Sequence, residues 1–274
     1  MQIGFIGVGR IASALVEGLA TTQPADEQVL LSPRGREQAA RLAQRYTHVQ
    51  IAPSNQAVVD AADPVFLCVG PAVAVDVLRP LRWRPGQLLI SLVALTPLAA
   101  VQRLAPEATV VRAVPLPTAS RRQSPTALFP PEPRAEALFD RLGAALPVDD
   151  ERALHVVWAT TGLIAPTFML LDEVRRWLER EGVAAETAQR FTLLQFHSLL
   201  EWALASPTLD LEALAREAAT PGGLNEQALR LLRQAGVSEA LRQTLDALLA
   251  RLEVAGPTER PGWEDQPPAG PLLT

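Results

Sequence analysis

The sequence predicts an α/β protein in which an N-terminal, doubly wound sheet is followed by an all-α C-terminal domain. Three observations predict this fold class. Short apolar runs alternate with helix-like segments up to about residue 148, as is typical of parallel strands joined by crossover helices. A glycine-rich segment directly follows the first apolar run. After residue 151 the strand-like runs disappear, and amphipathic stretches rich in Ala, Leu, Glu and Arg take over.

The first half of the chain supplies the predicted sheet. Its strands are short apolar runs, at residues 3–6, 29–32, 65–69, 88–92, 110–112 and 124–129. Its helices carry apolar residues at helical spacing, at residues 11–19, 35–45, 72–81 and 98–104. Because strands and helices alternate, we expect most strands of the sheet to be parallel.

The second half of the chain is predicted to be all helix. Its longest amphipathic stretches are residues 170–181 and 186–205, and Gly182 between them is typical of a helix end. Residues 210–218 and 225–252 are predicted to complete a helical bundle. The expected division is a first domain at residues 1–150, a second at residues 151–254, and a disordered, proline-rich tail at residues 255–274.

Composition excludes several classes of function. The chain has 274 residues and a formal net charge of −5, so we expect no nucleic-acid partner. Its apolar runs are shorter than the roughly 18 to 20 residues of a membrane-spanning helix, and its N-terminus lacks a signal-peptide pattern. The one cysteine, Cys68, lies in a predicted buried strand and cannot form an internal disulfide. We therefore expect a cytoplasmic protein with no membrane partner.

A Gly-Val-Gly-Arg-Ile-Ala segment that starts at Gly7 has the G-x-G-x-x-A pattern of a dinucleotide-binding turn. In this pattern Gly7 makes the tight turn, Gly9 lets a pyrophosphate approach the backbone, and Ala12 allows helix and strand to pack closely. Arg10 and Ile11 begin the helix, whose free N–H groups face the anion. A glycine turn with only a structural role is the alternative. Because the pattern follows an apolar strand, we favour a Rossmann-type dinucleotide site.

The end of the second predicted strand indicates which nicotinamide dinucleotide binds. An acidic residue there would bind the 2′-hydroxyl of NAD, whereas arginine accommodates the 2′-phosphate of NADP. This segment has no carboxylate before Glu37, but it contains Ser32, Arg34 and Arg36. We therefore predict NADP(H), with these three side chains around the 2′-phosphate. The alternative is that the arginines are solvated residues at a helix start.

Several further motifs occur in the order found in one enzyme family. They are Val-Arg-Ala-Val-Pro at residues 111–115, Thr-Ala-Leu at 126–128 and Thr-Pro-Gly-Gly at 220–223. Together with the opening residues 3–12, they resemble the pyrroline-5-carboxylate reductase family, and the similarity extends to about Leu252. The Thr-Pro-Gly-Gly segment is similar to that family's Ser-Pro-Gly-Gly-Thr-Thr signature.

The resemblance implies a Rossmann domain, a helical domain that builds a homodimer, and NADPH-dependent hydride transfer to the C=N carbon of a cyclic imino acid. A protonated imine is already electrophilic, so positioning supplies much of the rate. The implied catalytic residues are Thr220 and Asn225, the implied substrate-binding residues are Thr161, Gly162, Gly222, Gly223 and Leu224, and the implied further cofactor contacts are Val69, Gly70 and Pro71. An apolar stripe in the helical half, which includes Trp202, also favours a dimer.

Some positions depart from the family pattern. Leu116 stands where the family has the Asn of Met-Pro-Asn-Thr-Pro, and Gly70 replaces a common lysine. Leu224 and Asn225 replace paired threonines, although Asn225 can still donate a hydrogen bond. These changes predict a more apolar substrate pocket. From the residues alone, the Thr-Pro-Gly-Gly segment could equally be an interhelical turn, with Asn225 and Glu226 as a helix cap.

Other functions remain as alternatives. The sequence contains no lysine, which excludes the lysine-dependent mechanism of the related 3-hydroxyacid dehydrogenases. Metal-assisted chemistry would need clustered carboxylates, for which Asp172, Glu173 and Glu201 are weak candidates, and we expect no metal. His197 is predicted to be an ordinary helix or interface residue. A catalytically silent NADP-binding sensor or partner protein on the same fold is the main competing hypothesis.

Overall fold

The computed structural model describes residues 1–22, 24, 27–207 and 210–254. The predicted tail therefore lies outside the described residues. Contacts divide the chain into two compact units. Of the described residues, the first contains Met1–Trp158 together with residues 251–254, and the second contains Ala159–Ala250.

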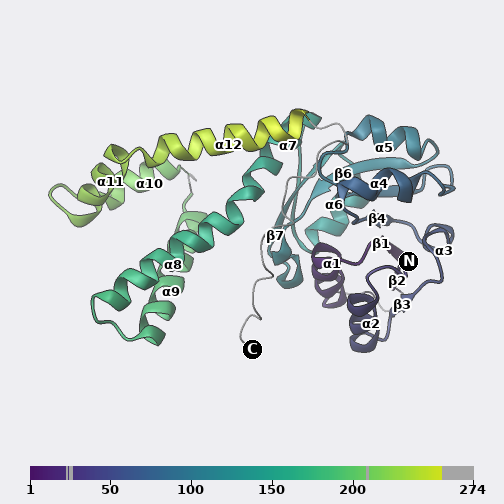
Figure 1. The fold of residues 1–274 in the computed structure, drawn as a ribbon, viewed down its shortest axis with the longest axis horizontal. Helices are drawn as coiled ribbons and strands as arrows, with labels where there is room; N and C mark the ends of the chain where they lie inside the picture. Colours follow the sequence, from purple (N-terminus) through teal and green to yellow (C-terminus); the bar gives the residue numbers. More distant parts are fainter. Residues whose placement is uncertain (23, 25–26, 208–209, 255–274) are drawn as a thin grey trace. The chain divides into compact units, whose positions relative to one another are not determined.

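The first unit is built on an eight-stranded sheet with the order β3-β2-β1-β4-β5-β6-β7-β8 (Figure 1). Neighbouring strands are parallel except for β6 and β7, which are antiparallel. The strands are β1 Gln2–Ile6, β2 Gln28–Leu31, β3 Val49–Ile51, β4 Val65–Leu67, β5 Leu88–Ser91, β6 Thr109–Val114, β7 Ser124–Phe129 and β8 Gly143–Pro147. The predicted doubly wound α/β fold is confirmed.

Helices cover both faces of this sheet (Figure 1). Buried side chains of α1, α2 and α6 pack with Phe5 and Phe66 in one apolar cluster, and those of α3, α4 and α5 pack with Ile6 and Leu67 in another. Apolar side chains on alternate positions of each strand point to opposite faces, so both layers are needed to bury them. The helices are α1 Arg10–Ala20, α2 Arg36–Arg45, α3 Asn55–Ala61, α4 Pro71–Leu78, α5 Leu98–Leu104, the 3₁₀ helix η1 Pro117–Arg121, α6 Pro133–Asp140 and α7 Glu151–Thr160.

Helix α1 packs against η1 with no space for a side chain at Gly18. A Cβ built on Gly18 would lie 2.1 Å from the carbonyl oxygen of Ala119 and 2.6 Å from a methyl carbon of Leu142. Both distances are shorter than any van der Waals contact of carbon. This glycine therefore allows α1 to pack closely against η1.

Besides the short 3₁₀ helix η1, the sequence analysis missed four elements of the first unit. Strand β3 has only one buried residue, and β8 is mostly exposed, so neither shows a continuous apolar run. Helices α3 and α6, of 7 and 8 residues, were not recognised from their apolar spacing. Each has a side chain that caps it: Ser54 accepts a hydrogen bond from the Ala57 amide, and Glu132 accepts one from the Ala135 amide.

The second unit is helical, as predicted. It contains the 3₁₀ turn η2 Thr161–Leu163, followed by α8 Ile164–Arg180, α9 Ala185–Ala205, α10 Leu211–Ala218, α11 Leu224–Gln234 and α12 Val237–Val254. The stretch predicted to be helical over residues 225–252 is divided into two helices, because the chain turns between α11 and α12. Gly236 has a positive φ of 75° and donates its amide to the Arg233 carbonyl, which ends α11.

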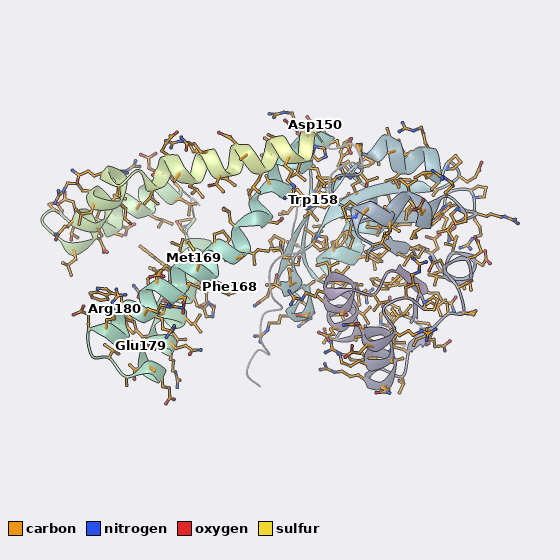
Figure 2. The ribbon with its side chains drawn as sticks, viewed as in Figure 1. Asp150, Trp158, Phe168, Met169, Glu179 and Arg180 are labelled. Atoms are coloured by element: carbon orange, nitrogen blue, oxygen red, sulfur yellow. The ribbon has the colours of Figure 1, made fainter. Side chains whose placement is uncertain are left out.

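Apolar side chains are unusually exposed in the second unit. Phe168 and Met169 on α8 are 64% and 58% exposed (Figure 2). The helical segment Glu151–Arg180 is also long and apolar enough to cross a membrane by length and composition, with a mean hydropathy of 1.6 over its most apolar window and 11% of that window buried. It is the only such helix among the described residues. The sequence analysis missed it because small polar residues interrupt the apolar run without adding charge, so the absence of a membrane partner stays a prediction.

Candidate active site

The glycine-rich turn joins β1 to α1 at the carboxyl edge of the sheet. Gly7 has a φ of +89°, and a Cβ there would lie 2.9 Å from the carbonyl oxygen of Cys68. Only glycine fits this turn without strain. Gly9 differs, because a Cβ built on it meets nothing within 4 Å. The space beside Gly9 is therefore open, as the close approach of a pyrophosphate requires.

The N-terminus of α1 is available to an anion. Gly9 is the N-cap residue, and no side chain among the described residues caps this helix. The amides of Arg10, Ile11 and Ala12 belong to its first turn, where the helix provides no acceptor. Ala12 is fully buried. The turn and the helix start thus fit a dinucleotide pyrophosphate.

Ser32 supports the turn from the end of β2. It is fully buried, and its hydroxyl oxygen accepts a hydrogen bond from the Gly7 amide at 2.9 Å. The hydroxyl hydrogen can still be donated to another group. Ser32 therefore joins the predicted 2′-phosphate segment directly to the glycine-rich turn.

The arginine pair lies beside the same turn. Gly35 has a φ of +79°, and a Cβ there would lie 2.6 Å from the carbonyl oxygen of Val8. Gly35 lies between Arg34 and Arg36, so this contact brings the backbone of both arginines close to the glycine-rich turn. Both arginines are exposed, and neither makes an ion pair with the described residues. Their guanidinium groups are free to bind a phosphate.

A surface hollow of about 560 Å³ begins at Arg34 and was not predicted from the sequence. Polar residues from the start of α3 form one side of it, and apolar residues of α4 and the following turn form the other. Its lining includes Pro33, Arg34, Ser54, Asn55, Val73, Val77 and Leu81. Asn55 was not identified from the sequence, because α3, the helix that it begins, was not recognised.

The segment after β4 completes this edge. The Cys68 amide donates to the Ile6 carbonyl at 2.8 Å, which holds the ends of β4 and β1 together. Val69 is partly buried, Gly70 is the N-cap of α4, and Pro71 is its first residue. A Cβ on Gly70 would meet nothing within 4 Å. Gly9 and Gly70, which both face open space, thus follow adjacent parallel strands.

In the second unit, the Thr-Pro-Gly-Gly segment forms the turn between α10 and α11. Gly222 has a φ of +73°, and a Cβ on Gly223 would lie 2.5 Å from the hydroxyl oxygen of Thr220. Both glycines are therefore required by the turn itself. Leu224 begins α11 and is 84% exposed.

Side chains of α11 form hydrogen bonds with backbone groups at this turn. The Gly222 amide donates to the Glu226 carboxylate at 2.7 Å, and the Asn225 side-chain amide donates to the Ala218 carbonyl at 3.1 Å. These contacts match the helix cap that local sequence also allowed. The bond to Glu226 shows in addition that the Gly222 amide can donate a hydrogen bond to a carboxylate.

A hollow of about 810 Å³ runs along α10, this turn and α11. Its lining includes both turn glycines and three arginines, Arg216, Arg230 and Arg233, of which Arg216 pairs with Glu212 at 2.6 Å. The same lining contains two glutamates, Glu212 and Glu226, so the arginines leave a formal excess of one positive charge around the turn.

The remaining predicted residues lie elsewhere in the second unit. Thr161 and Gly162 belong to η2, and a Cβ on Gly162 would lie 2.6 Å from a methyl carbon of Leu248. Gly162 therefore allows η2 and α12 to pack closely. Asp172 accepts hydrogen bonds from Arg175 and Arg176, which lower the pKa of its carboxyl group. Of the other two candidate acids, Glu173 is exposed and Glu201 lies 3.7 Å from His197, and no group of three or more acidic, His or Cys side chains among the described residues could hold a metal ion.

The structure also contains a buried charged cluster, which we call the Arg112 cluster: Arg112, Glu151, His155 and Trp158. Arg112 is fully buried in β6. Its Nη1 donates to Glu151 Oε1 at 2.6 Å and to His155 Nε2 at 2.8 Å, and its guanidinium carbon lies 5.1 Å from the centre of the Trp158 ring. An arginine inside an apolar strand needs such partners. An arginine within an apolar strand was the sequence signal for the cluster. The partners of Arg112 could not be identified from the sequence.

Acidification is expected to destabilise the protein through its partly buried histidines. Burial and the charge of Arg112 lower the pKa of His155, and burial lowers the pKa of His48. Glu151 and Glu253 oppose the shift at His155. A histidine with a lowered pKa takes up its proton in the unfolded chain first, at about pH 6.5. The free energy of unfolding should therefore be highest above that pH and fall as the pH decreases through the folded-state pKa.

Urea unfolding between pH 7.5 and pH 5 would measure this loss. His155→Gln keeps an acceptor for Arg112 and removes one titrating group, so its stability should depend less steeply on pH. An unchanged slope in that variant would contradict the assignment to His155.

Comparisons with known proteins agree with this geometry. Residues 2–95 match the family described as NADP oxidoreductase coenzyme F420-dependent, and residues 151–254 match pyrroline-5-carboxylate reductase dimerisation. A pyrroline-5-carboxylate reductase of Pseudomonas aeruginosa is 31% identical over 261 residues, covering 91% of this chain and 95% of that protein.

Solved structures share the fold. A 1-pyrroline-5-carboxylate reductase from Streptococcus pyogenes is 22% identical, with a TM-score of 0.80 over 92% of this chain and 98% of that chain. A Plasmodium falciparum pyrroline carboxylate reductase with NADP bound is 16% identical, with a TM-score of 0.81 over 93% and 98%. The silent-sensor alternative gains no support, because these relatives are named as reductases. The family resemblance is confirmed, and the chain belongs to the pyrroline-5-carboxylate reductase family of NAD(P)-dependent oxidoreductases acting on C=N bonds.

Proposed function

We propose that this protein is an NADPH-dependent reductase of pyrroline-5-carboxylate or a closely related cyclic imino acid. The observation that carries the choice of cofactor is the contact of Gly35 with Val8, since it brings Arg34 and Arg36 to the glycine-rich turn. Family membership supports the substrate class, because the 31% identical relative is named for pyrroline-5-carboxylate.

Different groups of residues would hold the different parts of the cofactor. Bound NADPH supplies a hydride for the C=N carbon. The backbone amides at the start of α1 would hold its pyrophosphate, and Ser32 with the arginine pair would hold its 2′-phosphate. Val69, Gly70 and Pro71 would line the edge next to the turn.

The substrate would be held by groups of the helical unit. We assign Thr220 and Asn225 as catalytic residues, with Thr161, Gly162, Gly222, Gly223 and Leu224 as substrate contacts. A substrate carboxylate at the Gly222 amide would replace Glu226, the carboxylate that occupies it in this structure. Leu116 and Leu224 in place of polar family residues favour an imine with more apolar surface than pyrroline-5-carboxylate itself.

We also propose a cytoplasmic homodimer assembled through the helical domain. The match of residues 151–254 to a dimerisation family supports it, and so do the exposed apolar side chains of α8 and α9. Burial against a second copy would also account for the apolar character of the segment Glu151–Arg180, with no need for a membrane. In this proposal residues 1–150 bind the cofactor and residues 151–254 bind the substrate and the second copy.

Turnover tests the proposed reaction. The purified full chain should oxidise NADPH when pyrroline-5-carboxylate or a related five- or six-membered cyclic imino acid is added. No oxidation across this series, together with no reduction of NADP by the corresponding amino acids, would contradict the proposal.

The double variant Arg34→Ala/Arg36→Ala is expected to lose affinity for NADPH and to keep its affinity for NADH. One hydrogen bond to a charged group contributes about 1.5–3 kcal/mol, so the loss for NADPH should be at least roughly tenfold. Calorimetric titration with both dinucleotides measures it. Arg41→Ala, on the same helix and near Glu17, is the matched control. An equal loss of NADPH and NADH affinity would remove the 2′-phosphate assignment.

A further inference from the structure

We propose that Arg112 and Glu151 position the nicotinamide half of the cofactor site, by holding both ends of the segment that follows β5. Neither side chain is proposed to touch the reacting atoms. They are positioning residues that act through the backbone of residues 93–98. This inference rests on the proposed function, because it concerns where the nicotinamide of NADPH would lie.

The sheet topology places this segment at the second half of the dinucleotide site. In a doubly wound sheet, a dinucleotide lies across the carboxyl ends of the strands where the strand order reverses, with one half on each side. The arginine pair follows β2, so the adenosine half belongs to the β1–β3 side. The nicotinamide half then belongs to β4, β5 and β6, which are mutually parallel. The segment after β5 lies at their carboxyl ends.

Two hydrogen bonds hold the ends of this segment. At its start, the carbonyl oxygen of Val93 accepts a hydrogen bond from Arg112 Nη2 at 3.4 Å. At its end, the amide of Leu98 donates to Glu151 Oε1 at 2.6 Å. The same carboxylate oxygen accepts from Arg112 Nη1 at 2.6 Å. One ion pair thus connects both ends of the segment to β6 and to the first turn of α7.

The segment between these ends has a backbone conformation that requires support. Leu95 has a positive φ of 62°. A large side chain with a Cβ is disfavoured in this left-handed region, and such a conformation persists only when the surroundings determine it. Leu95 lies between the two hydrogen-bonded ends. The Arg112–Glu151 pair is the charged group that holds both of them.

The guanidinium group is itself fixed in one orientation. Arg112 is fully buried, contacts the Trp158 ring, and donates to His155 as well as to Glu151. Its three partners all come from α7; Figure 2 labels Trp158 on this helix and Asp150, the residue directly before it. A side chain held on several sides transmits a fixed position to Val93 and, through Glu151, to Leu98. This is the property that a positioning residue needs.

Four variants of the full chain test the inference. Glu151→Ala removes the acceptor of both Arg112 and Leu98, whereas Glu151→Gln retains an acceptor oxygen. Asp150→Ala is the matched control, because it removes the hydrogen bond from the Ala153 amide in the same helical turn and leaves the Arg112–Glu151 pair intact. Arg112→Lys is a second disrupting variant, since an ammonium group cannot reproduce the fork of a guanidinium.

The readouts separate the two halves of the site. Affinity for 2′,5′-ADP reports the adenosine half, and the fluorescence of bound NADPH reports the nicotinamide half. Glu151→Ala and Arg112→Lys should shift that fluorescence toward the emission of free NADPH and lower kcat about 10- to 100-fold, as misplacement by about 1 Å can do. Their affinity for 2′,5′-ADP should stay within about twofold of wild type. Glu151→Gln should recover most of the activity, and Asp150→Ala should match wild type.

Two results would overturn the inference. One is wild-type fluorescence and kcat in both disrupting variants. The other is a loss of 2′,5′-ADP affinity that parallels the loss of kcat, because that is the result of general destabilisation. If the wild type binds NADPH but reduces no cyclic imino acid, the proposed reaction fails, and the fluorescence comparison still decides the role of the Arg112–Glu151 pair.

Discussion

The variant Gly9→Ala is expected to lose tight binding of NADPH while it stays as stable as the wild type. Gly9 has ordinary backbone angles for any residue, with φ of −100° and ψ of −164°, and its added Cβ meets no protein atom within 4 Å. The methyl group would instead occupy the space of the pyrophosphate. Loss of one or two charge-assisted hydrogen bonds, at about 1.5–3 kcal/mol each, predicts a decrease in affinity of at least roughly tenfold and up to more than 100-fold.

Calorimetric titration with NADPH and urea unfolding without cofactor measure the two effects separately. Gly7→Ala is the informative comparison, because its φ of +89° and the 2.9 Å approach to the Cys68 carbonyl oxygen predict a loss of stability as well as of binding. Wild-type affinity in Gly9→Ala would show that no pyrophosphate approaches this turn.

The variant Gly18→Ala is expected to show a large loss of folding stability. Alanine has the higher helix propensity by about 1 kcal/mol, which alone would stabilise α1. Its Cβ would however lie 2.1 Å from the carbonyl oxygen of Ala119, and a backbone atom cannot move aside as a side chain can. Overpacking of a core costs about 1–3 kcal/mol and occasionally more. Set against the gain in helix propensity, this cost predicts a net destabilisation of about 2 kcal/mol.

The midpoint of urea unfolding measures this change. Gly70→Ala is the control, because Gly70 has a negative φ and open space around its Cβ. Its midpoint should stay close to that of the wild type. Equal midpoints for Gly18→Ala and Gly70→Ala would show that α1 can shift away from η1 without cost.

The fold was predictable wherever burial left a pattern in the sequence. Strands β1, β4 and β5 are buried along their length and therefore appear as apolar runs. Edge strand β8 is mostly exposed and left no such run. The break at Gly236 was missed for a different reason: one glycine at a helical position is compatible with a continuous helix, and only the positive φ shows that it ends α11.

The candidate site was predictable where a motif is local in sequence. Gly7, Gly9 and Arg34 could be identified because the glycine-rich turn and the end of the next strand have fixed chemical roles. Asn55 and the partners of Arg112 could not, since their relation to the site arises from distant strands that the sheet brings together. Leu98 and Glu151, for example, are separated by 53 positions in sequence and joined by one hydrogen bond.

The order in which the elements occur along the chain has a consequence for biosynthesis. Every strand of the sheet precedes residue 148, and the last strand, β8, ends at Pro147. Since domains generally fold as units from the N-terminus during translation, the complete sheet can assemble while the ribosome is still producing the helices. The exposed apolar helices that follow emerge after that sheet is complete, and in the proposed homodimer they would stay uncovered until a second copy binds.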